Sequence, residues 1–445
     1  MPAAGHSIAI EPALQFESCW SPTVIERYYP VAKTFDELLK EPIVDHEHFV
    51  SISRFYLKTL CSVKPNRRTG SPGNREATDF FANTIRPFGY EIDAAPFECI
   101  DYACRGSELS HGEKIFDIYG SPYSLGCDVF AELKSISTIK QLENTNCVDK
   151  LLLMRGEICS EQLMPKNFVF YNPEHHKKII DLLEKRKPAG IITATEKKPE
   201  QVGALYPFPL IVDGDFDIPN AYCRDTVGDA LAARQGDSVR LKIDASRLPA
   251  SATNIIARLN SSAAEKIVFT AHIDAYEDSP GASDNASGTI VLLILAEMLA
   301  DYREGRCIEI AAFNGEDHYS AGGQMDYLRR YGDELPGVLL AVNIDDVGFE
   351  RGRSSFSFYE CPLQIKKKAE DVFQSFDGLA QGDQWFNGDH MIFVQKRVPS
   401  ISFTSECMPE LMRTVTHTSS DIPEIIDCGK LVEVAESLNA LARSL

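Results

Sequence analysis

The sequence predicts an α/β protein in which a mixed sheet is flanked by helices and joined to a second, β-rich segment. Short apolar runs such as 267–271 and CIEIAAF are followed by polar loops and then by helical segments, of which TIVLLILAEMLA is the most apolar. This order of strand, loop and helix is typical of α/β proteins. A chain of 445 residues is long for one compact unit, which favours two domains.

The N-terminal third begins with an extension, residues 1–45, in which only 34–40 has a helical pattern. Apolar residues then recur on one helical face over 46–63, and a second helix is expected over 77–88. Gly89 ends that helix, because glycine is common just beyond a helix C-terminus. The strand YEIDAAPF follows.

From about 105 to 250 the pattern changes to short strands such as KLLLMR and AGIITAT, separated by helical segments such as HHKKIIDLLEKR. No cluster of acids and histidines with metal-ligand spacing occurs there. His175 and His176 are adjacent, and neighbours on a helix face different ways, so both are predicted to be surface residues.

The residues that suggest chemistry follow strands in the last part of the chain. His272 ends the run 267–271, Asp274 comes two positions later, and a loop rich in Gly, Ser and Asp carries Asp284 to the next helix. Ligands bind beyond the carboxyl ends of strands in open α/β sheets. Imidazole and carboxylate groups there are the ligands that zinc takes.

Three further segments deliver groups of the same kind. Glu316 and Asp317 follow CIEIAAF, Asp345 and Asp346 follow VLLAVNI, and His417 lies in the polar loop THTSSDIPE. Acidic residues after one strand are ordinary loop charges. Their repetition after successive strands indicates a site. Asp346 is the less favoured ligand of its pair, because strand neighbours point to opposite sides.

These motifs resemble those of the co-catalytic zinc aminopeptidases of metallopeptidase family 28. GASDNASG, FNGED, NIDDVG and GDHMIFVQKRVPSISF carry the resemblance. It implies a three-layer sheet of the zinc-peptidase type, formed by 46–104 and 251–445. The resemblance also implies a role for each matching residue: His272, Asp284, Asp317, Asp345 and His417 as metal ligands, Glu316 as general base, and Asp274 as the carboxylate that orients His272. The family usually has Glu where this chain has Asp317, which bears on the affinity and identity of the metal there.

The segment 105–250 resembles a protease-associated domain inserted in a peptidase, in KLLLMRGE, KPAGIITA and FPLIVDGDFDIPNAYCRDTVGDAL. By analogy with the family, such a domain would shade the active-site cleft and limit substrate size.

A site with two zinc ions per chain makes chemical sense of this residue set. Two divalent ions roughly 3.5 Å apart need a shared carboxylate, the place given to Asp284. His272 and Asp345 would hold one ion, and Asp317 and His417 the other. A water between the ions would lose a proton easily to Glu316, which would later pass it to the leaving amine.

A substrate pocket is expected near GDHMIFV. Asp389 and His390 are candidates for its polar lining, and Met391 and Phe393, with Trp385 and Phe386, for its apolar walls. Aromatic residues more often belong to the core. His318, directly after Asp317, is expected to be a flanking residue.

Composition excludes some classes of protein. A formal net charge of −20 and a pI near 5.0 argue against nucleic acid as a partner. The N-terminus lacks the pattern of a secretory signal, no apolar run is long enough to span a membrane, and the 12 cysteines form no CxxC pair. A cytoplasmic protein with mostly reduced thiols is expected. The sequence gives no indication of the oligomeric state.

The expected function is that of a di-zinc aminopeptidase acting on peptides with a free N-terminus. Two alternatives remain: an aminoacylase or dipeptidase built on the same metal site, and a catalytically inactive binding or receptor homologue. The complete set of metal positions and Glu316 argue against the second. Glutaminyl cyclisation, which relatives perform with one zinc, is disfavoured because both metal positions look complete.

Overall fold

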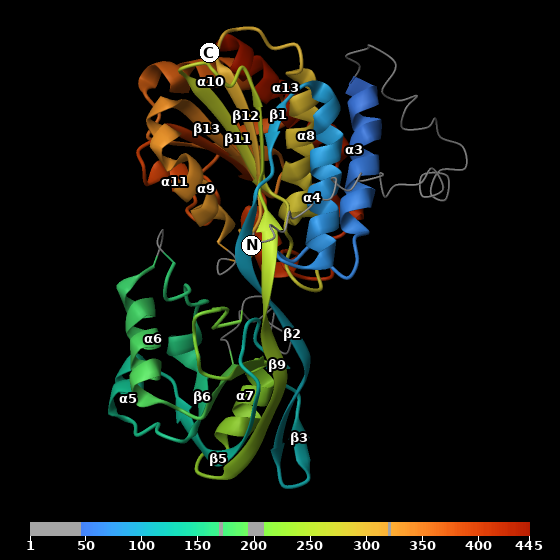
Figure 1. The fold of residues 1–445 in the computed structure, drawn as a ribbon. Helices are drawn as coiled ribbons and strands as arrows, with labels where there is room; N and C mark the ends of the chain where they lie inside the picture. The colour runs from blue at the N-terminus through green and yellow to red at the C-terminus, as the bar shows by residue number, and fades with distance from the viewer. Residues whose placement is uncertain (1–45, 169–171, 195–208, 319–321) are drawn as a thin grey trace, which may run out of the picture. The chain divides into compact units, whose positions relative to one another are not determined.

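The computed structural model describes residues 46–168, 172–194, 209–318 and 322–445 (Figure 1). The expected extension 1–45, with its helix at 34–40, lies outside the described residues. Residues 49–445 form one compact unit. It contains two eight-stranded sheets, both mixed, which confirms the α/β architecture.

The first sheet has the order β1-β10-β12-β11-β13-β16-β14-β15. Its centre, β12, β11, β13 and β16, is parallel, whereas β1, β10 and β14 pair antiparallel with their inner neighbours. The strands are β1 (Glu91–Asp93), β10 (Ile255–Leu259), β11 (Lys266–His272), β12 (Cys307–Phe313), β13 (Val338–Ile344), β14 (Ser354–Tyr359), β15 (Leu379–Gln381) and β16 (Ser400–Ser405).

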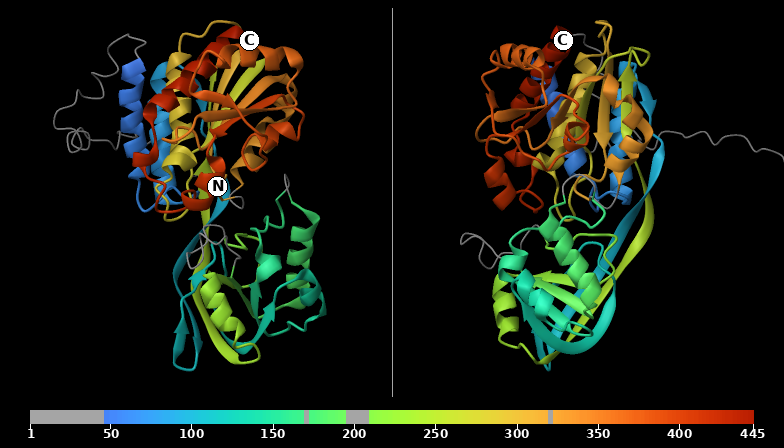
Figure 2. Two further views of the ribbon diagram at one scale, coloured as in Figure 1. Left: turned by 180° about the vertical axis from the view of Figure 1, so that it is seen from behind. Right: turned by 90° about the vertical axis from the view of Figure 1, so that its left-hand side faces the viewer.

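Helices cover both faces of this sheet (Figures 1 and 2). On one face α8 (Gly288–Met298) packs between the sheet, α4 (Pro72–Ile85) and α13 (Cys428–Ser444). Residues 288–296 of α8 are all buried, as its continuous apolar sequence predicts. On the other face, α9 (Gly323–Tyr331) and α11 (Met391–Val394) share a core cluster with Val268 and Phe313 of the sheet. The remaining helices of this part are α3 (His46–Cys61), α10 (Leu363–Phe373) and α12 (Met408–Thr414).

The helices expected between 46 and 88 form with shifted ends. α4 starts earlier than expected, because Ser71 caps it by accepting the amide of Asn74 at 3.0 Å and Pro72 suits the first turn. A short 3₁₀ turn, Arg86–Phe88, follows α4 and stops at Gly89, whose φ of 84° is left-handed.

The second sheet has the order β3-β2-β9-β5-β6-β7-β8-β4. Its longest pair, β2 and β9, is antiparallel from Pro96↔Thr253 to Ser110↔Arg240, so its strands extend beyond the segment 105–250 expected for the insertion. Its strands are β2 (Pro96–His111), β3 (Lys114–Phe116), β4 (Tyr119–Gly120), β5 (Cys127–Ile136), β6 (Leu151–Arg155), β7 (Gly190–Ala194), β8 (Asn220–Cys223) and β9 (Ser238–Thr253), and its helices are α5 (Ile139–Asn144), α6 (Glu174–Arg186) and α7 (Asp225–Ala232).

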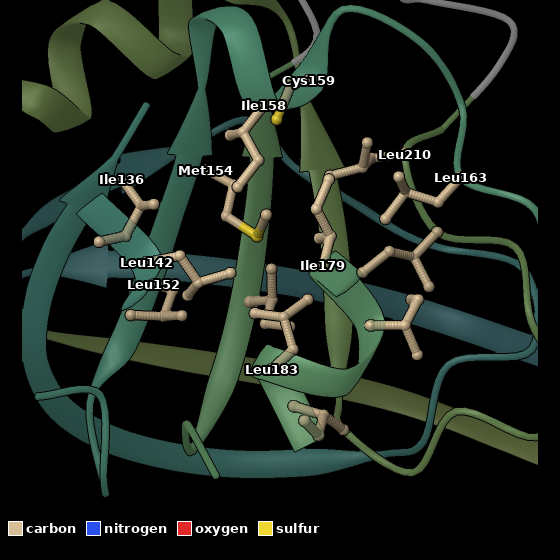
Figure 3. Packing of buried hydrophobic residues seen from close by; sticks show 14 of the residues in the cluster. Ile136, Leu142, Leu152, Met154, Ile158, Cys159, Leu163, Ile179, Leu183 and Leu210 are labelled. Carbon is tan, nitrogen blue, oxygen red and sulfur yellow. The ribbon is translucent and has the colours of Figure 1, made fainter. Parts of the chain in front are cut away.

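A core cluster holds α6 against this second sheet (Figure 3). Ile179 and Leu183 of α6 pack against Leu152 and Met154 of β6, all of them almost completely buried. The cluster also takes in Ile158, Cys159 and Leu163, which follow β6. The loop after β6 and the helix α6 are therefore fixed by one core.

Among the helices of the described residues, none combines the length and apolar composition that crossing a membrane requires.

Candidate metal centre

Three neighbouring strands bring the predicted ligands to one edge of the first sheet. β12, β11 and β13 lie side by side and run parallel, so their carboxyl ends meet at the same edge. His272 is the last residue of β11, Glu316 and Asp317 follow β12, and Asp345 directly follows β13. The parallel sheet thus places side chains from distant parts of the chain next to one another.

Asp284 reaches the same place from a loop anchored by a residue near the C-terminus. The carboxylate of Asp421 accepts the backbone amides of Ser283, at 2.7 Å, and of Asp284, at 3.1 Å. The peptide bond between Asp284 and Asn285 is cis, and Asn285 donates to the carbonyl of Ile344 at 2.9 Å. The hydrogen bonds of Asp421 and Asn285 hold the loop against the end of β13 and orient the Asp284 carboxylate.

The two oxygens of Asp284 face different histidines. Oδ1 lies 3.2 Å from Nε2 of His272, and Oδ2 lies 3.2 Å from Nε2 of His417. Nε2 of His272 is also 3.5 Å from Oδ1 of Asp345, and Nε2 of His417 is 2.7 Å from Oδ1 of Asp317. The five predicted ligands therefore form two groups that share one carboxylate.

Asp274 lies beside His272 in an unexpected orientation. Nδ1 of His272 is 3.2 Å from the backbone carbonyl of Asp274 and 3.6 Å from its carboxylate. That carboxylate instead accepts the amides of Gly315, at 3.0 Å, and Glu316, at 3.4 Å. Its second oxygen is 3.2 Å from Nδ1 of His318, which is fully buried. Asp274 thus fixes the backbone that carries Glu316, and His318 is more than a flanking residue.

The charges of the cluster shift its pKa values in opposite directions. Burial disfavours a charged His417, but the carboxylates of Asp317 and Asp284 raise its pKa to about 10. Burial likewise opposes ionisation of Asp284, yet the neighbouring imidazoles of His272 and His417 lower its pKa. Burial raises the pKa of Glu316 well above its ordinary value. Because several carboxylates are gathered here, a cation bound among these side chains would stabilise the cluster.

The residues present fit zinc. One atom each from His272, Asp284 and Asp317 lie within 4.8 Å of one another. Nε2 of His272, Oδ2 of Asp317 and Oδ1 of Asp345 are buried without a hydrogen-bond partner, a costly arrangement unless a ligand satisfies them. Nitrogen and carboxylate oxygen donors are those of catalytic zinc sites.

Two other residues of these motifs support the cluster. Asp346 is buried and accepts a hydrogen bond from the Ser283 hydroxyl at 2.7 Å, so it braces the Asp284 loop. The ring of Tyr276 stacks on His417, with centroids 4.4 Å apart and planes at 6°. Stacking of this kind fixes the direction of the imidazole.

A cavity of about 690 Å³ opens over the cluster. Glu316, Asp317 and Asp345 lie on one part of its wall, and Met408 and Met412 of the same domain add apolar surface. The second sheet's domain also contributes to the lining, with Glu161 and His176 among its residues.

The four residues predicted for the substrate pocket are not among those lining this cavity. Phe393 packs in the core cluster of α9 and α11. Asp389 and His390 are buried, with Asp389 accepting a bond from Gln324 at 2.7 Å, and Met391 is half-buried. Their neighbours Trp385 and Phe386 do line the cavity.

The prediction that His175 and His176 are both surface residues is wrong for His176, which is 1% exposed. Rotation by one helical position turns His176 toward the protein and leaves His175 exposed.

Sequence reasoning missed Asp421, Tyr276 and Glu161 as parts of the site. The first two lie inside the motifs THTSSDIPE and HIDAYED, so their positions offered a signal. Glu161 offered none, because only the folded chain brings it to the cavity.

The fold and this cluster define a candidate metal-binding domain, with a shared carboxylate and a buried acid at the carboxyl edge of a parallel sheet. Residues 254–442 match the sequence profile of Peptidase family M28, and they contain every residue of the cluster. This part of the chain is therefore similar in sequence to members of that family.

Curated relatives match with low identity. The probable lipoprotein aminopeptidase LpqL of Mycobacterium tuberculosis is 23% identical over 286 residues, 63% of this chain and 54% of the relative. Aminopeptidase YwaD of Bacillus subtilis is 25% identical over 244 residues, 52% of each chain. The chain spans about half the length of these curated relatives.

Solved structures share the fold over most of the chain. The aminopeptidase from Aneurinibacillus sp. strain AM-1 aligns with a TM-score of 0.70 and 20% identity, covering 88% of this chain and 93% of that one. BSAP, a zinc aminopeptidase from Bacillus subtilis, aligns with a TM-score of 0.69 and 18% identity, covering 91% and 96%. At these identities the likeness establishes the arrangement of both sheets.

Proposed function

We propose that the protein is a zinc aminopeptidase that hydrolyses the first peptide bond of substrates with a free N-terminus. The observation that carries this proposal is the position of Asp284, whose two oxygens face His272 and His417 separately. The match of residues 254–442 to Peptidase family M28 and the aminopeptidases among the relatives support it.

Two zinc ions per chain would be held by the two ligand groups, His272 with Asp345 and His417 with Asp317, with Asp284 common to both. When bound, zinc supplies a Lewis acid that polarises a carbonyl and makes a water more acidic. The Asp317 side chain is one methylene shorter than the Glu that the family usually has. Its Oδ1 nevertheless lies 2.7 Å from Nε2 of His417, the other ligand of this group. We expect the ion on this side to be the more weakly held.

Glu316 is the residue for proton transfer. It lines the cavity and is 6% exposed, and its backbone is fixed through the Asp274 carboxylate. A carboxylate in this position takes a proton from the attacking water and returns it to the departing amine.

The second sheet's domain, centred on residues 105–250, acts as a protease-associated domain that limits access to the site. Its contribution of Glu161, Met164 and His176 to the cavity wall supports this role. The cytoplasmic location expected from the sequence remains a prediction, to be checked by fractionation of cells that express the full chain.

Hydrolysis of leucyl peptides with free and N-acetylated termini tests the proposed activity. We expect cleavage of the free peptides only, and a loss of about 10³-fold or more in kcat for Glu316→Gln, because general acid and base catalysis contributes on this order. Glu297→Gln, which removes a carboxylate from α8 outside the cavity, is the matched control.

Cleavage of acetylated substrates instead would identify an aminoacylase, and cleavage restricted to dipeptides would identify a dipeptidase. Zinc binding without hydrolysis of any of these substrates would identify a binding protein.

A further inference from the structure

A second group of ionisable side chains lies on the cavity wall, away from the metal ligands. Nε2 of His175 is 2.8 Å and Nε2 of His176 is 3.1 Å from the same carboxylate oxygen of Glu161. The two imidazole rings meet edge to face, with centroids 4.3 Å apart. Glu161 and His176 both line the cavity that contains Glu316 and Asp317.

The position of this group is fixed by the core beneath it (Figure 3). Ile158, Cys159 and Leu163 flank Glu161 in the chain, and Ile179 follows the two histidines along α6. All four are buried in the same cluster. The carboxylate is thereby held in place before any ligand arrives, which lowers the entropy cost of binding.

Two imidazoles and a carboxylate also suggest a metal site, but the hydrogen bond behind His176 argues against it. The amide of Met164 donates to Nδ1 of His176 at 3.2 Å, so Nδ1 holds a lone pair. A neutral imidazole then carries its proton on Nε2, the atom that faces Glu161. A protonated Nε2 cannot bind a metal, whereas it suits a carboxylate acceptor.

The charges of the group agree with this arrangement. Burial lowers the pKa of His176, which keeps the ring neutral. The hydrogen bond with His175, together with His176, lowers the pKa of Glu161 despite the opposing effect of burial. The result is an ionised carboxylate on the cavity wall whose side chain is still 56% exposed.

Among the described ion pairs, Glu161 is paired with His175 and His176 and with no lysine or arginine. The carboxylates of the metal cluster would be occupied by zinc under the proposed function. Of the other carboxylates among the described lining residues, Glu316 would serve proton transfer and Asp346 accepts the Ser283 hydroxyl, which leaves Glu161 available to a cation.

We propose that Glu161, oriented by His175 and His176, is a specificity residue that binds the basic side chain of a lysine- or arginine-containing peptide substrate. This proposal rests on the proposed peptidase function. Met164 and Val212 of the same domain also line the cavity and would offer apolar surface to the aliphatic stem of such a side chain. The formal net charge of −20 adds a general attraction for basic peptides.

The test uses the full chain loaded with zinc, as native protein and as Glu161→Gln. Substrates are Leu–Leu–Ala, Leu–Lys–Ala and Lys–Leu–Ala amides. We expect Glu161→Gln to lower kcat/KM for a lysine-containing peptide about 10-fold, mainly through KM, as loss of a charged hydrogen bond predicts. Cleavage of Leu–Leu–Ala amide stays within about twofold. The lysine peptide that is affected identifies whether the basic residue precedes or follows the scissile bond.

Glu174→Gln is the matched control, because Glu174 neighbours the two histidines on α6 but is exposed, pairs with Lys177 and does not line the cavity. An equal loss of kcat/KM in Glu174→Gln would mean that the effect comes from the overall charge of the protein, and it would overturn the proposal. An equal loss on all three peptides with Glu161→Gln would overturn it as well.

Equilibrium binding separates failure of this proposal from failure of the proposed function. In a zinc-loaded Glu316→Gln background, calorimetry should show a lysine-containing peptide binding about 10-fold more tightly than Leu–Leu–Ala amide, a preference that Glu161→Gln removes. That preference without turnover in the native protein would refute the peptidase function and leave the recognition site standing. Absence of the preference, or a third zinc equivalent lost with Glu161→Gln, would overturn the recognition site.

Discussion

Arg67 shows how one buried side chain can hold the metal-binding loops. Its guanidinium donates to the carbonyls of Leu60, Ile273, Pro280 and Gly281 at 2.7 to 3.1 Å, and the residue is 2% exposed. Three of these carbonyls lie between His272 and Asp284. The planar guanidinium can serve several acceptors at once, which an ammonium group cannot reproduce.

We expect Arg67→Lys to lower the free energy of unfolding by about 2 to 4 kcal/mol, because buried carbonyls lose their donors. Urea denaturation measures this loss. Arg86→Lys, at an exposed arginine that contacts Asn83, should change it by less than about 0.5 kcal/mol. Equal effects of the two substitutions would mean that the four buried bonds add no stability.

His390 predicts a pH dependence of stability. Burial lowers its pKa to about 4, against about 6.5 in an unfolded chain. Below the unfolded value the unfolded state binds a proton that the folded state does not. The stability from this group is therefore complete above about pH 6.5 and is lost as the pH falls toward 4, by up to about 3 kcal/mol.

His390→Gln removes this titration. Its free energy of unfolding, measured in urea at a series of pH values with constant zinc, should fall less steeply than that of the native protein between pH 6.5 and 4. Parallel curves for the two proteins would show that His390 takes up a proton while folded.

Some residues of the site could be predicted from the sequence, and others could not. His272, Asp284 and Asp345 could be predicted to meet because they follow strands, and strand order fixes the edge where they lie. Phe393 and His390 could not be separated from pocket residues, because burial depends on the packing of α11 against the sheet. Glu161 lies outside every motif, and its place on the cavity wall depends on how the second sheet's domain folds.

Among the elements, the start of α8 depends on the absence of a side chain. A Cβ on Gly288 would lie 2.3 Å from the carbonyl oxygen of Ile344 and 2.5 Å from Oδ1 of Asn285. Both neighbours adjoin predicted ligands, Asp345 and Asp284. The close approach of α8 to the end of β13 thus brings ligands from the two elements together.

Gly288→Ala should lower the free energy of unfolding by about 1 to 3 kcal/mol, the usual cost of overpacking, and weaken zinc binding. Competition with a chelating dye measures the second effect. Gly332→Ala, at a site where a Cβ meets nothing within 4 Å, is the control and should leave both quantities unchanged. Normal zinc affinity in Gly288→Ala would show that the ligands do not depend on this contact.

The molecule as a whole combines a metal-binding domain with a second domain that completes its cavity wall. The first sheet positions the ligands, the Asp421 anchor orients Asp284, and the loop after β6 adds Glu161 to the same cavity. The architecture, and the edge of the sheet where the ligands lie, could be predicted from the strand and helix patterns. The residues that line the cavity could not, because they come together through contacts between segments more than a hundred residues apart.

Titration of metal-free protein with zinc tests whether two zinc ions act together in catalysis. We expect hydrolysis of leucyl peptides to rise until about two equivalents are bound per chain, since the shared carboxylate links two sites, and Glu316→Gln to bind the same two equivalents without activity. Full activity at one equivalent would contradict a mechanism that needs two zinc ions. An active Glu316→Gln protein would contradict the role of Glu316 as general base.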